Sequence, residues 1–149
     1  MVGPDQTCGV PGCLIGENLA FPRDVVDFCT SSGQPGLVLS LDQAKAFDRM
    51  DWSFLHSVLL HMSLGPSFCN WVQLFYHGAS SLVSVNAFIS DFFLLTQGVR
   101  QGCPISPLLY VLVVEVLACN VRAHPNISGI CLPGLVTPLP TISAQIMLS

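Results

Sequence analysis

Asp42 and Phe47 lie five residues apart, at the end of a short apolar run, Leu37 to Leu41, that is followed by acidic residues. A strand that ends in a turn can direct a carboxylate and an aromatic ring into one cleft, the carboxylate toward a divalent cation and the ring toward a sugar. The alternative is structural, because Asp42, Asp48 and Asp51 could complement the positive amino terminus of a following helix. These residues alone leave both interpretations open.

A second candidate cluster is the polar loop from Gly98 to Pro107, Gly-Val-Arg-Gln-Gly-Cys-Pro-Ile-Ser-Pro. Gly98 and Gly102 flank the pair Arg100 and Gln101, and glycine allows the backbone to come close to a ligand. The Arg and Gln side chains carry donors that suit phosphate and sugar hydroxyl groups. The alternative is an ordinary loop that leads into a helix and binds nothing.

The element expected to position Asp42 is a buried strand from Leu37 to Leu41. The run is too short for a helix, and Gly33, Pro35 and Gly36 bound it upstream. Asp42 then leaves the carboxyl end of the strand, where open α/β sheets usually bind ligands.

Four segments with apolar residues at helical spacing are predicted to form helices. The second and third should pack antiparallel on one face of a sheet, with their aromatic stripe in the core. The four are residues 17–29, beginning at Pro22; 52–62, capped by Asp48 and stopped by Gly65; 66–76, opened by Pro66 and ending near Gly78; and 107–123, capped by Ser106. The last is apolar over most of its surface, which predicts burial on nearly all sides.

Residues 81–85 and 88–95 predict a β-hairpin about Asn86 and Ala87. An Asn-Gly turn would be more favourable, because both central residues of a type I′ turn need a positive φ. The chain becomes turn-rich after His124, and Thr141 to Leu148 is a last possible strand. The predicted class is α/β (α+β), with helices packed on a small sheet.

The composition limits the possible functions. Hydrophobic residues make up 51% of the 149 residues and charged residues only 9%, against about a quarter in typical domains. The net charge of -4 argues against tight autonomous binding of nucleic acid. No secretory signal is expected, because the first residues lack the charged and apolar regions of one. No membrane span is expected, because the apolar run from Leu108 stops at Glu115. Seven irregularly spaced cysteines predict reduced thiols in an intracellular protein, and Cys8 with Cys13 is a weak zinc candidate.

Three stretches together carry a family resemblance. They are Ser-Leu-Asp-Gln-Ala-Lys-Ala-Phe-Asp-Arg-Met-Asp-Trp at 40–52, Gly-Pro-Ser-Phe-Cys-Asn-Trp-Val-Gln-Leu-Phe-Tyr at 65–76, and Gly-Val-Arg-Gln-Gly-Cys-Pro-Ile-Ser-Pro-Leu-Leu-Tyr at 98–110. In this order and at these separations they resemble the reverse transcriptase of a LINE-type, non-LTR retrotransposon, from about Asp5 to Leu139. The resemblance implies a partial palm of a right-hand polymerase at 37–149, preceded by a remnant of the fingers at 1–36.

The resemblance also implies roles for particular residues. Asp42 matches the first metal-binding aspartate, which helps to hold two Mg²⁺ ions, and Phe47 matches the ring that packs on the nucleotide sugar and discriminates against a 2′-OH. Gln101 and Gly102 match the pair beside nucleotide and template, with Arg100 next to them, whereas Asp48 is interpreted as a cap. The implied reaction is attack of a DNA primer 3′-OH on the α-phosphorus of a deoxynucleotide (dNTP), directed by an RNA template.

Three departures from the family pattern bear on activity. Cys13 stands where the finger motif has an Arg, and Ala87 stands where the hairpin turn has a Gly. The family's Tyr/Phe-Ala-Asp-Asp hairpin has no match in Thr141 to Ser149, and no Asp or Glu follows Glu115. One aspartate cannot hold two Mg²⁺ ions, so the chain as it stands is expected to be inactive.

Two alternatives belong to other functional classes. A retained palm remnant could serve as a non-enzymatic binding module, which the high apolar content favours. The chain could also be a translated remnant of a retrotransposon without a function. The sequence leaves open the oligomeric state, the choice between nucleus and cytoplasm, the target site of the element and the presence of an endonuclease domain.

Overall fold

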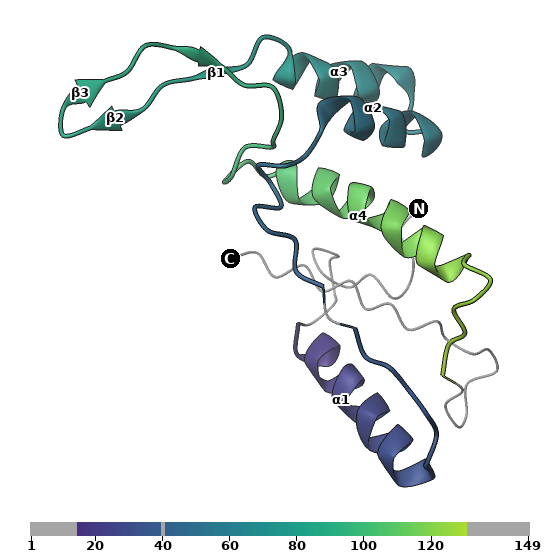
Figure 1. Ribbon diagram of the computed structural model, residues 1–149. Helices are drawn as coiled ribbons and strands as arrows, with labels where there is room; N and C mark the ends of the chain where they lie inside the picture. Colours follow the sequence, from purple (N-terminus) through teal and green to yellow (C-terminus); the bar gives the residue numbers. More distant parts are fainter. Residues whose placement is uncertain (1–14, 40, 131–149) are drawn as a thin grey trace. The chain divides into compact units, whose positions relative to one another are not determined.

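The computed structural model describes residues 15–39 and 41–130 (Figure 1). The chain divides into two compact units, one of residues 1–43 with 113–149 and one of residues 44–112. Cys8, Cys13 and the possible strand at 141–148 lie outside the described residues. Helices occur together with short antiparallel strands, which confirms the mixed class, while the palm assignment stays a prediction.

The first unit contains helix α1, Ile15–Ser32, with Pro22 inside it. The prediction that this helix begins at Pro22 is therefore wrong. Proline has no N–H to donate to the carbonyl four residues earlier, but the loss of one bond is tolerated where the turns on both sides continue the helix. Ser32 Oγ donates to the Phe28 carbonyl at 2.7 Å, and Gly33 follows with φ +67°, a common helix ending.

Residues 34–39 follow α1 as an irregular segment that pairs with no strand of the described residues. Leu37, Leu39 and Leu41 are 87%, 70% and 68% exposed, so the predicted buried strand from Leu37 to Leu41 is wrong. A strand requires a neighbour for its backbone N–H and C=O groups. Within the described part of the chain, both strand pairings belong to the hairpin of the other unit.

Helix α4, Ser106–Arg122, contains the boundary between the units. It begins at the predicted Ser106-Pro107 step. Leu108 and Leu117 are more than half exposed, so the burial expected on nearly all sides is incomplete; the buried apolar residues are Leu109, Tyr110, Val111 and Ala118. Among the helices that the structure describes, none is long and apolar enough to cross a membrane.

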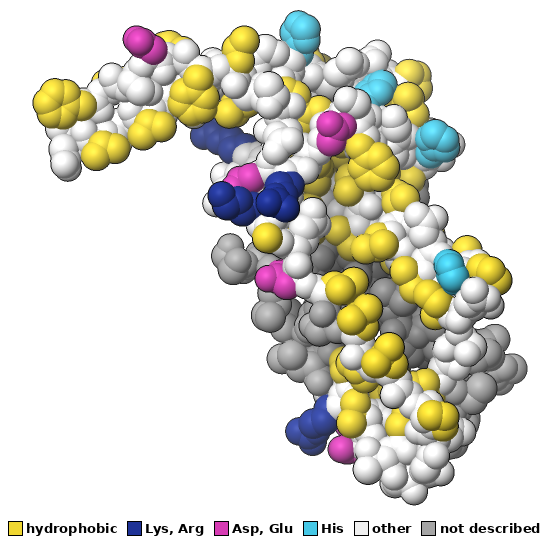
Figure 2. Space-filling model, in the orientation of Figure 1, with side chains coloured by type: hydrophobic (Ala, Val, Ile, Leu, Met, Phe, Trp, Pro, Cys, Tyr) yellow, Lys and Arg dark blue, Asp and Glu magenta, His cyan; other side chains and the backbone are white. Residues whose placement is uncertain are grey.

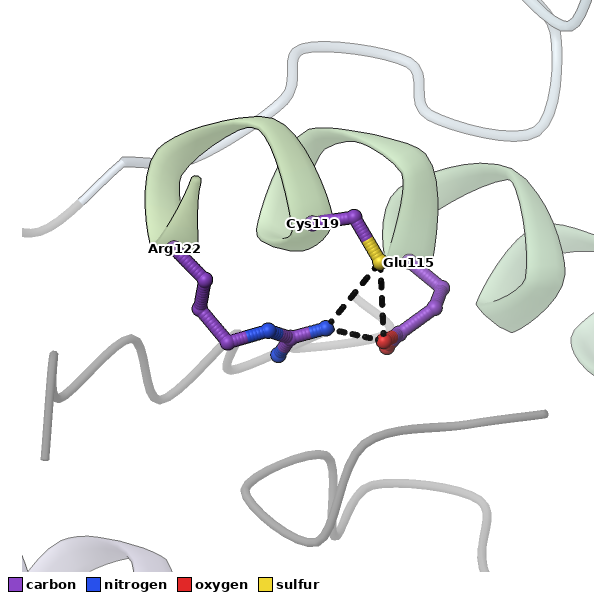
Figure 3. A network of polar contacts seen from close by, with 3 residues as sticks. All are labelled: Glu115, Cys119 and Arg122. Atoms are coloured by element: carbon purple, nitrogen blue, oxygen red, sulfur yellow. Dashed lines mark hydrogen bonds and ion pairs between the residues drawn. The ribbon is translucent and has the colours of Figure 1, made fainter. Parts of the chain in front are cut away.

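Glu115 of α4 is a carboxylate that is only 2% exposed. Its Oε1 forms an ion pair with Nη2 of Arg122 and lies 3.5 Å from Sγ of Cys119 (Figure 3). The three residues are spaced at four and seven positions, so they share one face of the helix. The arginine compensates for the burial of the carboxylate, and we assign this network to structure.

The second unit contains helix α2, Trp52–His61. Asp51 is its N-cap, because the Asp51 carboxylate accepts a hydrogen bond from the Phe54 N–H at 2.7 Å. The prediction that Asp48 caps this helix is wrong. Residues 44–49 form a turn in which the Asp48 N–H donates to the Lys45 carbonyl at 3.0 Å, so the N-cap lies three residues later in the chain than predicted.

Replacing the two aspartates separately should distinguish the true cap. Asp51→Ala should lower the free energy of unfolding by about 1 kcal/mol, because a donor at the helix amino terminus loses its acceptor. Asp48→Ala should change it by less than about 0.5 kcal/mol, as for an ordinary surface site. Urea denaturation followed by circular dichroism measures both, and a larger effect of Asp48→Ala would contradict the assignment.

Helix α3, Pro66–Tyr76, begins at the predicted proline. It packs against α2 (Figure 1), and the residues buried in the two helices are Leu55, Val58, Leu59, Cys69 and Val72. Among the described elements these helices contact each other and no strand, so the expected packing on a sheet is not found.

The aromatic stripe of α3 does not form a core. Trp71 is 62% exposed and Phe75 58%, which contradicts the predicted burial. The inner face of α3 is the neighbouring one, which carries the buried residues Cys69 and Val72. Figure 2 shows hydrophobic side chains exposed at many places on this face, among white backbone and other side chains.

A β-hairpin extends from the second unit (Figure 1). Near its base β1, Ser80–Ser81, pairs with β4, Phe93–Leu94, and near its tip β2, Ser84–Val85, pairs with β3, Phe88–Ile89. Asn86 and Ala87 have φ of 49° and 67°, which confirms a turn with two left-handed residues. Between the two ladders residues 90–92 face residues 82–83, so the returning arm has a β-bulge.

Candidate nucleotide site

The two clusters predicted from the sequence are joined by backbone hydrogen bonds within the second unit. The Val99 N–H donates to the Phe47 carbonyl and the Gly98 N–H to the Met50 carbonyl, both at 2.8 Å. The Gln97 side-chain amide donates to the Asp48 carbonyl at 3.2 Å. The turn at 44–50 and the loop at 97–102 therefore form one substructure, which we name the turn–loop unit.

Gly98 makes this close contact possible. Its φ is +98°, and a Cβ at this position would lie 3.2 Å from the Asp48 carbonyl oxygen and 3.3 Å from that of Phe47. Both oxygens belong to the backbone and cannot rotate away. The sequence predicts that the backbone of Gly98 comes close to a ligand. The structure shows that it comes close to the backbone of Phe47 and Asp48 instead.

Gly102 differs from Gly98, because its surroundings are open. Its φ is +79°, and nothing lies within 4 Å of the position that a Cβ would take. Arg100 and Gln101 beside it are also exposed. These three residues form the exposed outer rim of the loop, and their contact with a ligand stays a prediction.

Trp52, the first residue of α2, supports the loop from the other side. Its indole N–H donates to the Gly98 carbonyl at 2.7 Å. Its ring stacks on Tyr76 of α3, with 5.4 Å between centroids and 20° between planes. The sequence pattern assigned Trp52 only to a helix core, because a hydrogen bond across 46 residues leaves no local signal.

The ring of Phe47 is half-buried. It packs edge-to-face on Tyr110 of α4, with 5.5 Å between centroids and 66° between planes. Tyr110 is itself buried, so it holds the orientation of the Phe47 ring. A ring fixed on one side with part of its surface open is a suitable platform for a sugar.

Cys103 follows the rim residues where α4 begins. A hydrogen bond from the Ile105 N–H holds its pKa below the ordinary value of a thiol, and Ser106 and the positive charge of Arg100 add to this effect. Tyr76 has a raised pKa, chiefly because its phenol is partly buried. The start of α4 thus favours the thiolate form of Cys103 but not the anionic form of Tyr76, a feature that the sequence analysis did not assign.

A cavity of about 490 Å³ also lies between α2 and α3. Trp52 and Tyr76 line it, together with the polar side chains of His56, Gln73 and His77. None of the five residues predicted from the sequence lies in its wall. It is therefore separate from the candidate nucleotide site.

Asp42 is exposed and belongs to the first unit, whereas Phe47, Arg100, Gln101 and Gly102 belong to the second. In the described part of the chain, no three His, Cys, Asp or Glu side chains gather so that they could hold a metal ion. Two catalytic Mg²⁺ ions need several carboxylates with the substrate phosphates. The described residues therefore do not fit a complete Mg²⁺ site.

Comparison with known proteins identifies the class. Residues 6–132 match the family model described as reverse transcriptase (RNA-dependent DNA polymerase). The chain therefore belongs to the reverse transcriptase family, and its relatives place it with the reverse transcriptases of non-LTR retrotransposons. This confirms the resemblance drawn from the three motifs. Enzymes of this family generally use a divalent metal ion.

Three relatives show how much of a longer protein the chain matches. It is 39% identical to the uncharacterized 149 kDa protein of transposon TX1 from Xenopus laevis, over 82% of this chain and 9% of that protein. It is 31% identical to the Pol polyprotein of the type-2 retrotransposable element R2DM from Drosophila melanogaster, over 52% of this chain and 7% of that protein. It is 28% identical to the Pol polyprotein of the type-1 retrotransposable element R2 from Popillia japonica, over 62% of this chain and 13% of that protein. The chain thus spans a small part of each relative.

Proposed function

We propose that the turn–loop unit is the nucleotide-facing wall of an RNA-directed DNA polymerase site. The observation that carries the proposal is the backbone pairing of the Phe47 turn with the Arg100 to Gly102 loop. In a member of the reverse transcriptase family, these are the two segments matched to sugar and nucleotide contacts. The intact enzyme would act on an RNA template, a DNA primer and dNTP.

Each residue has a role that follows from its surroundings. Phe47, held by Tyr110, presents a fixed surface to the sugar and restricts the space at its 2′ carbon. Arg100 and Gln101, exposed on the rim, donate hydrogen bonds to phosphate and sugar oxygens. Gly102 has no side chain, so the nucleotide or template can come close to its backbone. Trp52 acts as a positioning residue through the Gly98 carbonyl.

Asp42 is proposed as a metal ligand of the intact enzyme. Because the described residues do not complete a Mg²⁺ site, we derive no metal-dependent step from them. We propose instead that this polypeptide alone does not polymerise DNA. The alternative function, a non-enzymatic interaction module, is favoured by the exposed aromatic face of α3.

Nucleotide binding tests the role of the rim. Arg100→Ala should weaken the binding of a fluorescent dNTP by about tenfold, because a charge-assisted hydrogen bond of roughly 1.5 kcal/mol is lost. Arg49→Ala removes an exposed arginine from the same turn–loop unit and should have an effect of less than about twofold. Fluorescence polarisation measures the affinity of both variants. Equal losses of affinity would show that Arg100 contributes only its positive charge and no specific contact.

Primer extension tests the proposed inactivity. The purified chain, given an RNA template, a DNA primer, dNTP and Mg²⁺, should yield no cDNA above a no-enzyme control. A reverse transcriptase that is active on the same template serves as the positive control. Robust cDNA synthesis by this chain would show that the described carboxylates do not limit activity.

A further inference from the structure

The cavity between α2 and α3 has no role in the proposed nucleotide site. Its volume of about 490 Å³ lies within the range of roughly 300 to 1,000 Å³ that is typical of small-molecule sites. Its whole wall belongs to the second unit. Leu55 and Val72 of this wall are only 1% and 2% exposed, so the interior of the cavity is apolar. We name it the α2–α3 cavity.

Trp52 and Tyr76 give the α2–α3 cavity two aromatic side chains, whose rings stack on each other. The indole N–H of Trp52 is already used, since it donates to the Gly98 carbonyl at 2.7 Å. Trp52 can therefore offer a ligand the surface of its ring but no hydrogen bond. Aromatic rings attract one another in offset and edge-to-face arrangements, so these side chains favour a flat aromatic ligand.

The wall also carries polar side chains that can donate hydrogen bonds, namely those of His56, Gln73 and His77. Within the described part of the chain, none of these three side chains has a hydrogen-bond partner. Each imidazole can donate from a ring nitrogen, and the Gln73 amide can donate from its nitrogen. The donors thus come from both helices to the same cavity.

The charge of the wall limits the ligand further. Among the residues that the structure describes, the wall contains no Asp, Glu, Lys or Arg. An ammonium group would find no carboxylate to balance its charge, and a triphosphate would bring several negative charges to a wall without a cation. A single carboxylate can be held by several uncharged N–H donors. The wall therefore fits one carboxylate better than a dNTP.

We propose that the α2–α3 cavity is a second ligand site, which binds an aromatic monocarboxylate. The ring of the ligand lies against Trp52 and Tyr76, and its carboxylate accepts hydrogen bonds from the three polar side chains. A bound ring opposes any movement of Trp52 away from Gly98, so an occupied cavity stabilises the loop at 97–102. The proposal is independent of dNTP binding, because the cavity contains none of the residues proposed to contact the nucleotide.

Three probes with the same ring and different charges test the class of ligand. Naphthoate should bind the full chain with a dissociation constant below about 1 mM, as a ligand of this size allows. Naphthylmethylammonium should bind at least about tenfold more weakly, with the uncharged naphthylmethanol between the two. Titration calorimetry measures all three. Failure of naphthoate to bind, or an ammonium probe that binds as tightly, would overturn the proposal.

Substitutions in the wall test the position of the carboxylate. His77→Ala should weaken naphthoate binding about tenfold, because a donor to the carboxylate is lost. His61→Ala is the matched control and should change nothing, because His61 is also exposed but lies outside the wall. Equal effects of the two substitutions would contradict the assignment.

Ser53→Asp should reverse the charge preference. Ser53 is an exposed residue of the wall in the first turn of α2, where a negative charge suits the helix. The variant should therefore fold, and it should bind naphthylmethylammonium more tightly than naphthoate. A variant that keeps the preference for naphthoate would show that the probe binds elsewhere.

Hydrogen exchange tests the connection to the loop in the absence of dNTP. If the loop opens only when Trp52 leaves Gly98, opening also requires the ligand to dissociate. Naphthoate at ten times its dissociation constant should then slow exchange of the Gly98 and Val99 amides about tenfold. The Ser90 amide, which donates to the Val83 carbonyl in the hairpin, should be unaffected. Bound naphthoate without slower exchange at Gly98 and Val99 would contradict the stabilisation of the loop.

Discussion

Gly98→Ala should lower the free energy of unfolding by about 2 to 3 kcal/mol. The new Cβ would lie 3.2 Å and 3.3 Å from two carbonyl oxygens, and the φ of +98° is unfavourable for alanine. The hydrogen bonds of Gly98 and Val99 fix the loop against the turn. Relief of the contact therefore requires the two segments to separate.

Gly102→Ala is the matched control for this substitution. Gly102 also has a positive φ, but open space surrounds its α-carbon. Alanine at this position should lower the free energy of unfolding by only about 1 kcal/mol, the cost of a positive φ for a residue with a Cβ. Urea denaturation compares the two variants, and equal losses would show that Gly98 is needed for its φ alone and not for the contact with Asp48 and Phe47.

Trp52→Ala should lower the free energy of unfolding by about 3 kcal/mol. The substitution removes the hydrogen bond to the Gly98 carbonyl and the stacking on Tyr76, and it leaves a part-buried carbonyl unpaired. Trp52→Phe keeps an aromatic ring and removes only the indole N–H. It should lower the free energy of unfolding by about 1 to 1.5 kcal/mol, which measures the contribution of the hydrogen bond. The loop amides of Gly98 and Val99 should exchange faster in both variants.

The second tryptophan of the chain is the control. Trp71 is 62% exposed, so Trp71→Ala should cost less than about 0.5 kcal/mol and leave exchange at Gly98 and Val99 unchanged. The two substitutions delete the same side chain from neighbouring helices. A larger effect of Trp71→Ala would mean that the aromatic stripe forms a core after all, as its spacing predicts.

The features predicted correctly are those set by local chemistry. Pro66 opens α3, the Ser106-Pro107 step opens α4, and Asn86 with Ala87 forms the hairpin turn. Each depends on the backbone preferences of a few adjacent residues. Such preferences act within one turn of the chain and can therefore be read from the sequence.

The predictions that were wrong depended on partners or on competition between neighbours. The run from Leu37 to Leu41 has the composition of a strand, but strand formation requires a second segment, which composition does not supply. Asp48 and Asp51 are both good caps, and the turn at 44–49 decides between them. The face of α3 that becomes buried is decided by its packing partner α2, and it carries Cys69 and Val72 rather than the larger Trp71 and Phe75.

The sequence selects candidate residues for the site, but it does not show how the site is built. Phe47, Arg100, Gln101 and Gly102 were selected through motif chemistry and family resemblance, and the structure brings their two segments together. The supports, Trp52 and Tyr110, could not be selected because their contacts join residues far apart in the sequence. Whether Asp42 completes the site in the intact enzyme stays a prediction.

The most direct test of the proposed nucleotide site is a titration of the ¹⁵N-labelled chain with dNTP, followed by NMR. The amide signals of residues 45–50 and 98–102 should shift together and give one dissociation constant. Arg100→Ala should raise that dissociation constant without moving the signals of the free protein elsewhere. Shifts confined to the cavity lined by His56 and His77, or no shifts at any concentration, would contradict the assignment of the turn–loop unit to nucleotide binding.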